Sequence, residues 1–192
     1  MSARLLIIPG LHDSGPAHWQ TWLQGFDRHA VRVEQRDWAT PDLERWSARI
    51  ASVLERAGPG PWIAAAHSFG CLALARHLAR HGDSPVAAAL FVAPADPHKF
   101  GLAELLPSAP LARPSVVIGS ETDPWMSAAD ARAWARRWGS HWINLGDAGH
   151  INAEAGFGPL PLARRWAIAM GQRLQRDQRP QRADIAEWSF AI

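Results

Sequence analysis

Short, continuous runs of apolar residues recur along this chain and constrain its fold more than any other feature. Strands that are apolar on both faces are typical of a parallel sheet covered by helices on each side. Stretches with helical character lie between the runs, which predicts a single α/β domain with a mostly parallel sheet of about six strands, helices on both faces and right-handed crossovers. The runs are residues 5–9, 31–35, 62–66, 86–92, 115–119 and 141–145.

Helices are expected between these strands. Thr40-Pro41 has the form of an N-cap followed by proline at the first helical position, and Gly58 follows the end of that helix. Glycine also follows two of the other expected helices, at Gly82 and Gly139. The expected helices cover residues 41–56, 69–80, 127–138 and 162–175.

Residues 1–176 are expected to form the domain. The chain has 192 residues, of which 47% are hydrophobic, enough for one sizeable core and too few for two ordinary ones. Residues 177–192 begin as a polar segment and are expected to be a C-terminal tail of unknown role. Residues 94–114 form a long, proline-bearing connection of the kind that often covers a binding site.

The charge pattern predicts neither a nucleic acid nor a membrane as partner. The formal charge is +2 and the arginines are scattered, whereas a nucleic-acid-binding surface needs basic groups clustered on one face. No run approaches the length of a membrane span, and the apolar stretch near the N-terminus is too short for a signal peptide. Cys71 is the only cysteine, which is compatible with a cytoplasmic location. The sequence leaves open whether the protein has a protein partner and which oligomeric state it adopts.

The segment Ala66-His67-Ser68-Phe69-Gly70 lies where a predicted strand turns into a helix. A serine at such a turn raises its hydroxyl above the sheet, and its neighbours must be small because the turn is strained. Ala66 and Gly70 are these small neighbours, although the usual motif has glycine at the first of the two positions. Taken alone, Ser68 would by default be interpreted as a serine at the end of a strand that caps the following helix.

Two later residues are candidate partners of Ser68. A serine hydroxyl is a poor nucleophile until a base takes its proton, and the base needs a third group that orients it. Asp123 follows the fifth predicted strand and His150 follows the sixth, so all three lie at C-terminal strand ends, where ligand sites gather in parallel sheets. Asp96 and Asp147 are the alternatives for the acid.

An acyl-transfer site also needs backbone N–H groups that bind the oxyanion. One is expected to come from Phe69, directly after the nucleophile, and the second from the loop of residues 9–15 after the first strand. Gly10 permits a close backbone approach there, with Leu11 as the preferred donor and His12 as the alternative. The substrate pocket is expected to be lined by His12, Phe100, Leu102 and Leu105.

Other chemistries have less support. His67 is expected to be a buried, hydrogen-bonded structural histidine, and Cys71 a small packed residue. His12 and His18 lack the accompanying ligands of a known metal site, so no metal is expected. No phosphate-binding glycine motif follows the first strand, which argues against a nucleotide cofactor.

Together these motifs resemble the small serine hydrolases related to retinoblastoma-binding protein nine. The similarity extends over about residues 5–166, and its most diagnostic part is the first loop, Pro9-Gly10-Leu11-His12-Asp13-Ser14-Gly15-Pro16-Ala17-His18-Trp19. The segment His67-Ser68-Phe69-Gly70, the Asp123 loop and Gly149-His150 complete it. The resemblance implies a single-domain α/β-hydrolase fold without a large cap domain, and a Ser-His-Asp triad that needs no cofactor.

Two functions are therefore open. The first is a serine hydrolase that cleaves a small-molecule ester, thioester or amide through an acyl-enzyme intermediate on Ser68. The alternative is a hydrolase fold that serves as a protein-binding module with little or no turnover.

Overall fold

The computed structural model of the protein describes residues 3–188, with side chains as far as residue 177. Strands and helices alternate along the chain, as the apolar runs predict. The strands are β1 (Arg4–Ile8), β2 (Val31–Arg32), β3 (Trp62–Ser68), β4 (Val86–Pro94), β5 (Ser115–Gly119) and β6 (His141–Asn144). The α-helices are α1 (Trp19–Gln24), α2 (Leu43–Ala57), α3 (Phe69–Arg80), α4 (Ala128–Arg137) and α5 (Pro161–Trp188), and two short 3-10 helices are η1 (Pro97–Phe100) and η2 (Ala103–Leu105).

The six strands form one sheet in the order β2-β1-β3-β4-β5-β6. Every neighbouring pair is parallel, which confirms the predicted sheet. The strand order reverses beside β1, since the chain goes to β2 on one side and then crosses to β3 on the other. In open α/β sheets a crevice forms at such a reversal, outside the C-terminal ends of the strands. The loop after β1 and the turn after β3 therefore meet at this crevice.

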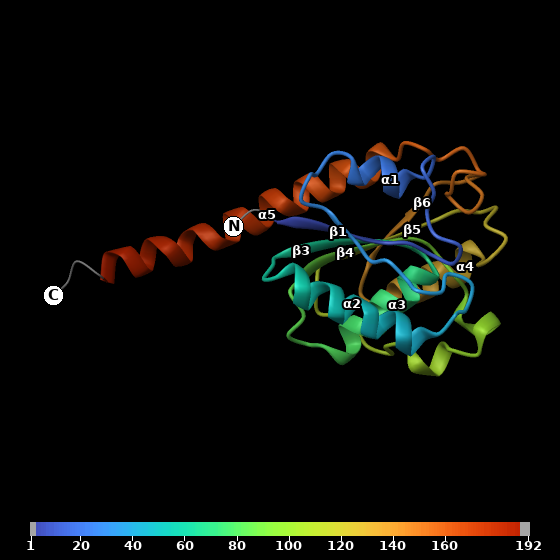
Figure 1. The fold of residues 1–192 in the computed structure, drawn as a ribbon, viewed down its shortest axis with the longest axis horizontal. Coiled ribbons are helices and arrows are strands. Elements are labelled where there is room, and N and C mark those ends of the chain that lie inside the picture. Colours follow the sequence, from blue (N-terminus) through green and yellow to red (C-terminus); the bar gives the residue numbers. More distant parts are fainter. Residues whose placement is uncertain (1–2, 189–192) are drawn as a thin grey trace.

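Helices cover both faces of the sheet (Figure 1): α2, α3 and α4 lie on one face, and α1 and α5 on the other. Alternate residues of one strand enter different cores. In β1, Leu6 packs with the α2 and α3 side and Ile7 with the α1 and α5 side, and both are fully buried. Because each strand is buried on both faces, its sequence does not alternate in polarity.

The boundaries of several elements differ from the expectation. Helix α2 begins at Leu43 and not at Pro41, because the Asp42 side chain, not Thr40, accepts the N–H of Arg45 and caps the helix. Helix α1 was not expected: it has only 6 residues, too few for a clear helical period. Strand β2 has 2 residues of the expected five because it lies at the edge of the sheet and pairs with β1 alone.

Helix α5 extends further than expected. The sequence suggested an end near residue 175, but the helix continues to Trp188 and projects beyond the sheet in Figure 1. Arginine and glutamine, which have high intrinsic helix propensities, are frequent in its second half, although Pro180 in the same stretch disfavours a helix interior. The expected division between domain and tail, at residues 176 and 177, thus falls inside this helix, and the separate tail remains a prediction. Its last residues, 189–192, lie outside the described part.

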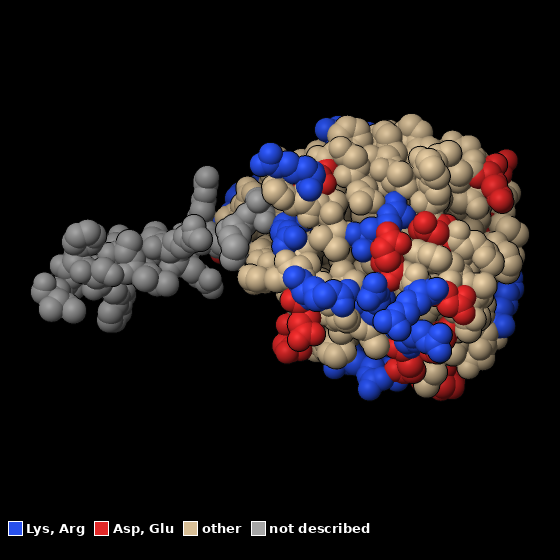
Figure 2. Space-filling model, in the orientation of Figure 1, with Lys and Arg blue, Asp and Glu red and all other residues tan. Residues whose placement is uncertain are grey.

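Acidic and basic side chains are interspersed over the face shown in Figure 2, without a large patch of one sign. Within the described residues, no helix combines the length and the apolar character that crossing a membrane requires.

Candidate active site

The turn between β3 and α3 holds Ser68 in a strained backbone conformation. Its φ and ψ angles are 52° and −125°, and φ is positive although serine has a Cβ. The neighbouring chain is so close that a Cβ at Gly10 would lie 2.7 Å from Cβ of Ser68. A Cβ at Gly70 would collide with the backbone carbonyl oxygens of Ile8 and Pro9. The other small neighbour, Ala66, is fully buried in the core on the α2 and α3 side.

Ser68, His150 and Asp123 form a continuous chain of hydrogen bonds. Oγ of Ser68 lies 2.9 Å from Nε2 of His150, and Nδ1 of His150 lies 2.9 Å from both carboxylate oxygens of Asp123. A carboxylate only accepts, so Nδ1 carries a proton, and in the neutral imidazole Nε2 accepts the hydrogen bond of the serine hydroxyl. The side chains of His150 and Asp123 are 9% and 3% exposed.

Two hydroxyl side chains of the loop after β5 link it to the loop after β6. Oγ of Ser120 accepts the N–H of Ala148 at 3.0 Å, and Oγ1 of Thr122 accepts the N–H of Gly149 at 3.0 Å. These bonds fix the loop that precedes His150. The carboxylate of Asp123 in turn accepts the N–H of Trp125 at 2.9 Å. Asp123 and His150 are therefore held in their relative positions by hydrogen bonds to neighbouring backbone.

The two alternatives for the acid have other partners. Asp147 accepts the hydroxyl of Thr122 at 2.7 Å and so belongs to the turn between the two loops. Asp96 accepts the N–H of His98 at 2.9 Å and caps η1. The geometry therefore favours Asp123 as the carboxylate beside His150.

The loop after β1 is held beneath the crevice by a buried glutamine. Gln20 is fully buried, and its Nε2 donates to the carbonyl oxygens of Ile8 and Ala65, at 3.0 and 2.9 Å. Its Oε1 accepts the hydroxyl of Ser14 at 2.6 Å. One side chain thus connects the C-terminal parts of β1 and β3 with the loop between β1 and α1.

Among residues 3–177, the backbone N–H groups of Leu11 and Phe69, the two preferred oxyanion donors, are free to bind a ligand, whereas that of His12 is not. The N–H of His12 donates to the carbonyl of Trp38 at 2.9 Å. The N–H of Leu11, in contrast, has no acceptor within the described residues. Phe69 is the first residue of α3, whose initial N–H groups have no partner inside the helix. Leu11 and Phe69 are therefore better donors than His12.

A cavity of about 380 Å³ opens beside Ser68. It contains two of the expected pocket residues, His12 and Phe100, and the candidate donor Leu11. Its wall combines apolar, aromatic and polar side chains. It is lined by Leu11, His12, Asp13, Gly15, His18, His67, Ser68, Ala95, Phe100, Trp125, His150, Asn152, Ala153 and Glu154.

Two expected pocket residues do not line this cavity. Leu102 packs against the core on the α2 and α3 side, and Leu105 is 38% exposed. The backbone carbonyl of Leu105 accepts a hydrogen bond from Arg76 on α3, which directs η2 toward that helix. In place of these leucines, Trp125 from the Asp123 loop and residues 152–154 form part of the wall. The position of Trp125, two residues after Asp123, was the one signal in the sequence that could have identified it.

Two buried histidines lie next to His150. Burial, with nearby Arg32 and His150, lowers the pKa of His18 to about 4. Burial likewise holds the pKa of His67 well below its usual value, helped by His150 and His18. Both imidazoles are therefore neutral at pH 7. As expected for a packed residue, Cys71 is buried, and burial raises the pKa of its thiol well above the ordinary value.

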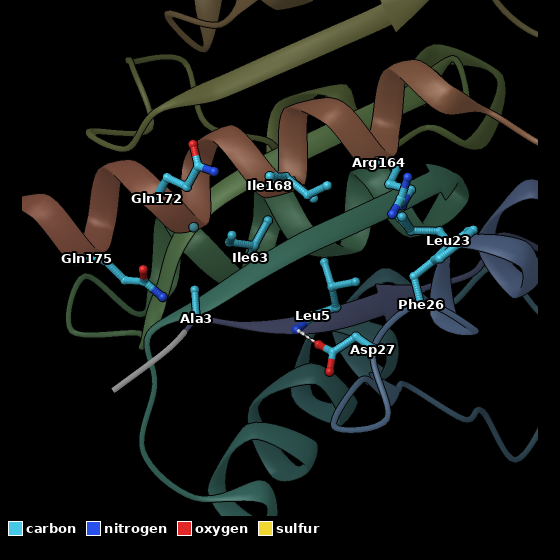
Figure 3. A pocket seen from close by; sticks show the side chains of 12 residues that line it. Ala3, Leu5, Leu23, Phe26, Asp27, Ile63, Arg164, Ile168, Gln172 and Gln175 are labelled. Carbon is cyan, nitrogen blue, oxygen red and sulfur yellow. Dashed lines mark hydrogen bonds between the residues drawn. The ribbon is translucent and has the colours of Figure 1, made fainter.

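A second cavity, of about 320 Å³, lies between α5 and the strands β1 and β3 (Figure 3). Leu5, Leu23 and Ile63 give it an apolar lining, with Arg164 and Asp27 among its polar residues. It contains none of the residues of the Ser68 hydrogen-bond chain. Within the part of the chain that the structure describes, no group of three or more histidine, cysteine or acidic residues is arranged to hold a metal ion.

Comparison with known proteins gives a consistent assignment. The sequence model of a family described as serine hydrolase matches residues 5–168. A YdeN-like hydrolase from Pectobacterium atrosepticum is 36% identical, with 90% of this chain and 92% of that chain covered and a TM-score of 0.83. No curated protein matches significantly.

More distant solved structures share the fold. The ydeN gene product of Bacillus subtilis is 20% identical, with 88% of this chain and 98% of that chain covered and a TM-score of 0.74. The esterase RhEst1 of a Rhodococcus species is 16% identical, with 91% and 90% covered and a TM-score of 0.63. The expected single-domain α/β-hydrolase fold is confirmed by these likenesses.

Proposed function

The chain belongs to the serine hydrolase family, and from this membership we propose that it cleaves a small ester, thioester or amide through an acyl-enzyme intermediate on Ser68. The observation that carries the proposal is the hydrogen-bond chain from Oγ of Ser68 through His150 to Asp123, with 2.9 Å at each step. A serine with a base and an orienting carboxylate is the arrangement that activates a hydroxyl for attack on an acyl carbonyl.

In the proposed reaction, Oγ of Ser68 attacks the acyl carbonyl while Nε2 of His150 takes the hydroxyl proton. The N–H groups of Leu11 and Phe69 bind the developing oxyanion, and each is expected to contribute roughly 3 kcal/mol to the stabilisation of the transition state. His150 then passes the proton to the leaving group. In the second half, His150 takes a proton from water, the hydroxide attacks the acyl carbon, and Ser68 regains its proton from His150.

The carboxylate of Asp123 keeps His150 in the required tautomer. Because it accepts the Nδ1 proton, Nε2 remains free to take the serine proton, and the carboxylate stabilises the imidazolium that forms. No step of the proposed reaction transfers a proton to Asp123.

The size of the cavity supports a small substrate. Its volume, about 380 Å³, lies at the lower end of the range that is usual for sites of small organic molecules. Phe100 and Trp125 give part of the wall an aromatic character, and polar side chains such as Asn152 and Glu154 also line it. We therefore propose a compact acyl group. Because the same chemistry cleaves esters, thioesters and amides, assays with each class of substrate are needed to identify the bond that the protein cleaves.

The test is labelling of the purified protein with a fluorophosphonate, a reagent that phosphonylates activated serines, followed by mass spectrometry. We expect an adduct on Ser68 in the wild type and none in Ser68→Ala, with a strongly reduced rate in His150→Ala. Hydrolysis of small aryl esters should follow the same order. A folded wild-type protein that gains no adduct and cleaves none of the esters, thioesters or amides would contradict the proposal and favour the protein-binding module.

A further inference from the structure

His67, the residue directly before Ser68, makes a hydrogen bond to the backbone of the base. Its Nε2 lies 3.0 Å from the carbonyl oxygen of His150, although 83 positions separate the two residues. The side chain of His67 also packs against the ring of His150, with 4.8 Å between the ring centroids. One imidazole therefore joins the turn that carries the serine to the loop that carries the base.

The protonation of His67 follows from its partner and its burial. A carbonyl oxygen only accepts, so Nε2 of His67 must carry a proton. Burial lowers the pKa of His67 well below its ordinary value, so Nδ1 has no proton at neutral pH. His67 is therefore a neutral donor. A second positive charge beside His150 would oppose the formation of the imidazolium during the reaction.

His18 also packs against His67. The ring centroids are 4.7 Å apart and the rings meet edge to face. Nδ1 of His18 accepts the N–H of Gln20 at 3.2 Å, which fixes this ring at the start of α1. His67 thus contacts the rings of both His18 and His150, so packing as well as its hydrogen bond holds its orientation.

The loop around His150 needs such an anchor because its backbone is strained. Gly149 and Ile151, on either side of His150, both have positive φ, at 52° and 47°. Positive φ is unfavourable for a β-branched residue such as isoleucine and persists only where the surroundings enforce it. The carbonyl that accepts the His67 hydrogen bond lies between these two residues, where a fixed peptide orientation determines where the imidazole points.

We propose that His67 is a positioning residue for the reaction, which donates Nε2–H to the carbonyl of His150 and thereby holds the base in line with Ser68. This role rests on the proposed function of Ser68 and His150. It differs from simple core packing, because it requires a donor at one atom of the side chain and not only its volume.

The test compares two substitutions at this position. His67→Gln places an amide N–H near the place of Nε2, whereas His67→Leu keeps the side chain buried but has no donor. The readout is the rate of fluorophosphonate labelling of Ser68 per folded molecule. His77→Leu is the matched control: His77 is also buried and bonded, to Oγ of Ser84 at 2.8 Å, but it lies outside the catalytic cavity.

We expect His67→Leu to slow labelling about 100-fold, because a displacement of reacting groups by about 1 Å has an effect of this order. His67→Gln should regain most of the rate, and His77→Leu should label like the wild type. Equal rates for wild type and His67→Leu, or equally slow rates for both His67 variants, would overturn the positioning role while Ser68 labelling of the wild type still supports the proposed function. If the wild type itself does not label, the proposed function fails and the positioning role with it.

If a His67 variant does not fold, a measurement on the wild type still tests whether His67 donates Nε2–H to the carbonyl of His150. Nitrogen-15 chemical shifts distinguish the two neutral tautomers of an imidazole. We expect His67 in the Nε2–H form at pH 7, with a proton–nitrogen coupling to Nε2. A neutral Nδ1–H form, or a protonated ring, would overturn the proposal.

Discussion

Nε2 of His150 lies 2.9 Å from Oγ of Ser68, although the two residues are 82 positions apart in the chain. The turn after β3 and the loop after β6 bring them together. Neither turn is relaxed, since Ser68 and Ile151, the residue after His150, have positive φ although both carry a Cβ. Strain of this kind gathers at sites where geometry serves chemistry.

The acid is tested by Asp123→Asn. The variant should keep the fold, but its kcat should fall by about 10⁴-fold, because an amide can stabilise the wrong tautomer of the base. Asp147→Asn is the matched control, since Asp147 is bonded to Thr122 and not to His150. Steady-state hydrolysis of an aryl ester measures both. Similar losses in the two variants would show that the loop structure, and not the carboxylate beside His150, is required.

The close packing of the nucleophile turn is tested by Gly70→Ala. The added Cβ would meet the carbonyl oxygens of Ile8 and Pro9, which are backbone atoms that cannot rotate away. We expect the free energy of unfolding to fall by about 1–3 kcal/mol, as for other overpacked sites. Gly82→Ala is the control, because a Cβ at Gly82 has no neighbour within 4 Å. Chemical denaturation of the two variants gives the comparison, and equal stabilities would contradict this account of the turn.

The buried histidines predict an acid-sensitive fold. The pKa of His18 and that of His77 are lowered by burial from 6.5 to about 4. Between these two values the unfolded chain binds protons that the native protein does not, so the free energy of unfolding decreases as the pH falls from 6.5 toward 4. Each such histidine contributes at most about 1.4 kcal/mol per pH unit to this slope.

Denaturant titrations between pH 7 and pH 4.5 measure the slope. His77→Leu should reduce this slope by up to about 1.4 kcal/mol per pH unit, the contribution of one histidine. Ser84→Ala should lower the free energy of unfolding but retain the slope, since the buried imidazole of His77 is still present. A slope that is unchanged in His77→Leu would show that His77 does not contribute to the acid sensitivity.

The wall of the cavity is tested by Trp125→Ala. Trp125 is 50% exposed, and its ring centroid lies 6.3 Å from that of His150. Because the N–H that holds Asp123 belongs to the backbone, the variant keeps that bond. We expect KM for aryl esters to rise about fivefold, the equivalent of about 1 kcal/mol of aromatic contact, with little change in kcat. Phe26→Ala, at the second cavity, is the control, and equal effects of both substitutions would argue against a substrate contact by Trp125.

Sequence reasoning was most successful where a local pattern has a single structural interpretation. The unbroken apolar runs predict a parallel sheet because a strand buried on both faces has no position for polar residues. The shorter elements were harder. Helix α1 has too few residues to show a period, and the start of α2 was misplaced because Asp42, and not Thr40, turned out to be the cap.

The pocket could be predicted only in part. Leu102 and Leu105 looked like pocket residues because they are apolar and follow β4, yet the bond from Arg76 to the carbonyl of Leu105 holds η2 against α3. Trp125 lines the cavity instead, as a consequence of the turn that presents Asp123. Which residues line the cavity therefore depends on hydrogen bonds between residues far apart in the chain, and a local sequence pattern does not predict such bonds.

The sequence by itself determined the fold class, the order of the strands and the location of Ser68, Asp123 and His150 at C-terminal strand ends. Burial leaves a local pattern of apolar residues in the sequence, so buried strands can be identified from the order of residues along the chain. Only the tertiary structure decided which aspartate lies beside the base, which residues enclose the cavity, and that His67 joins the two loops. Hydrogen bonds are directional and extend over about 3 Å, so contacts between residues 83 positions apart exist only after the whole sheet has formed.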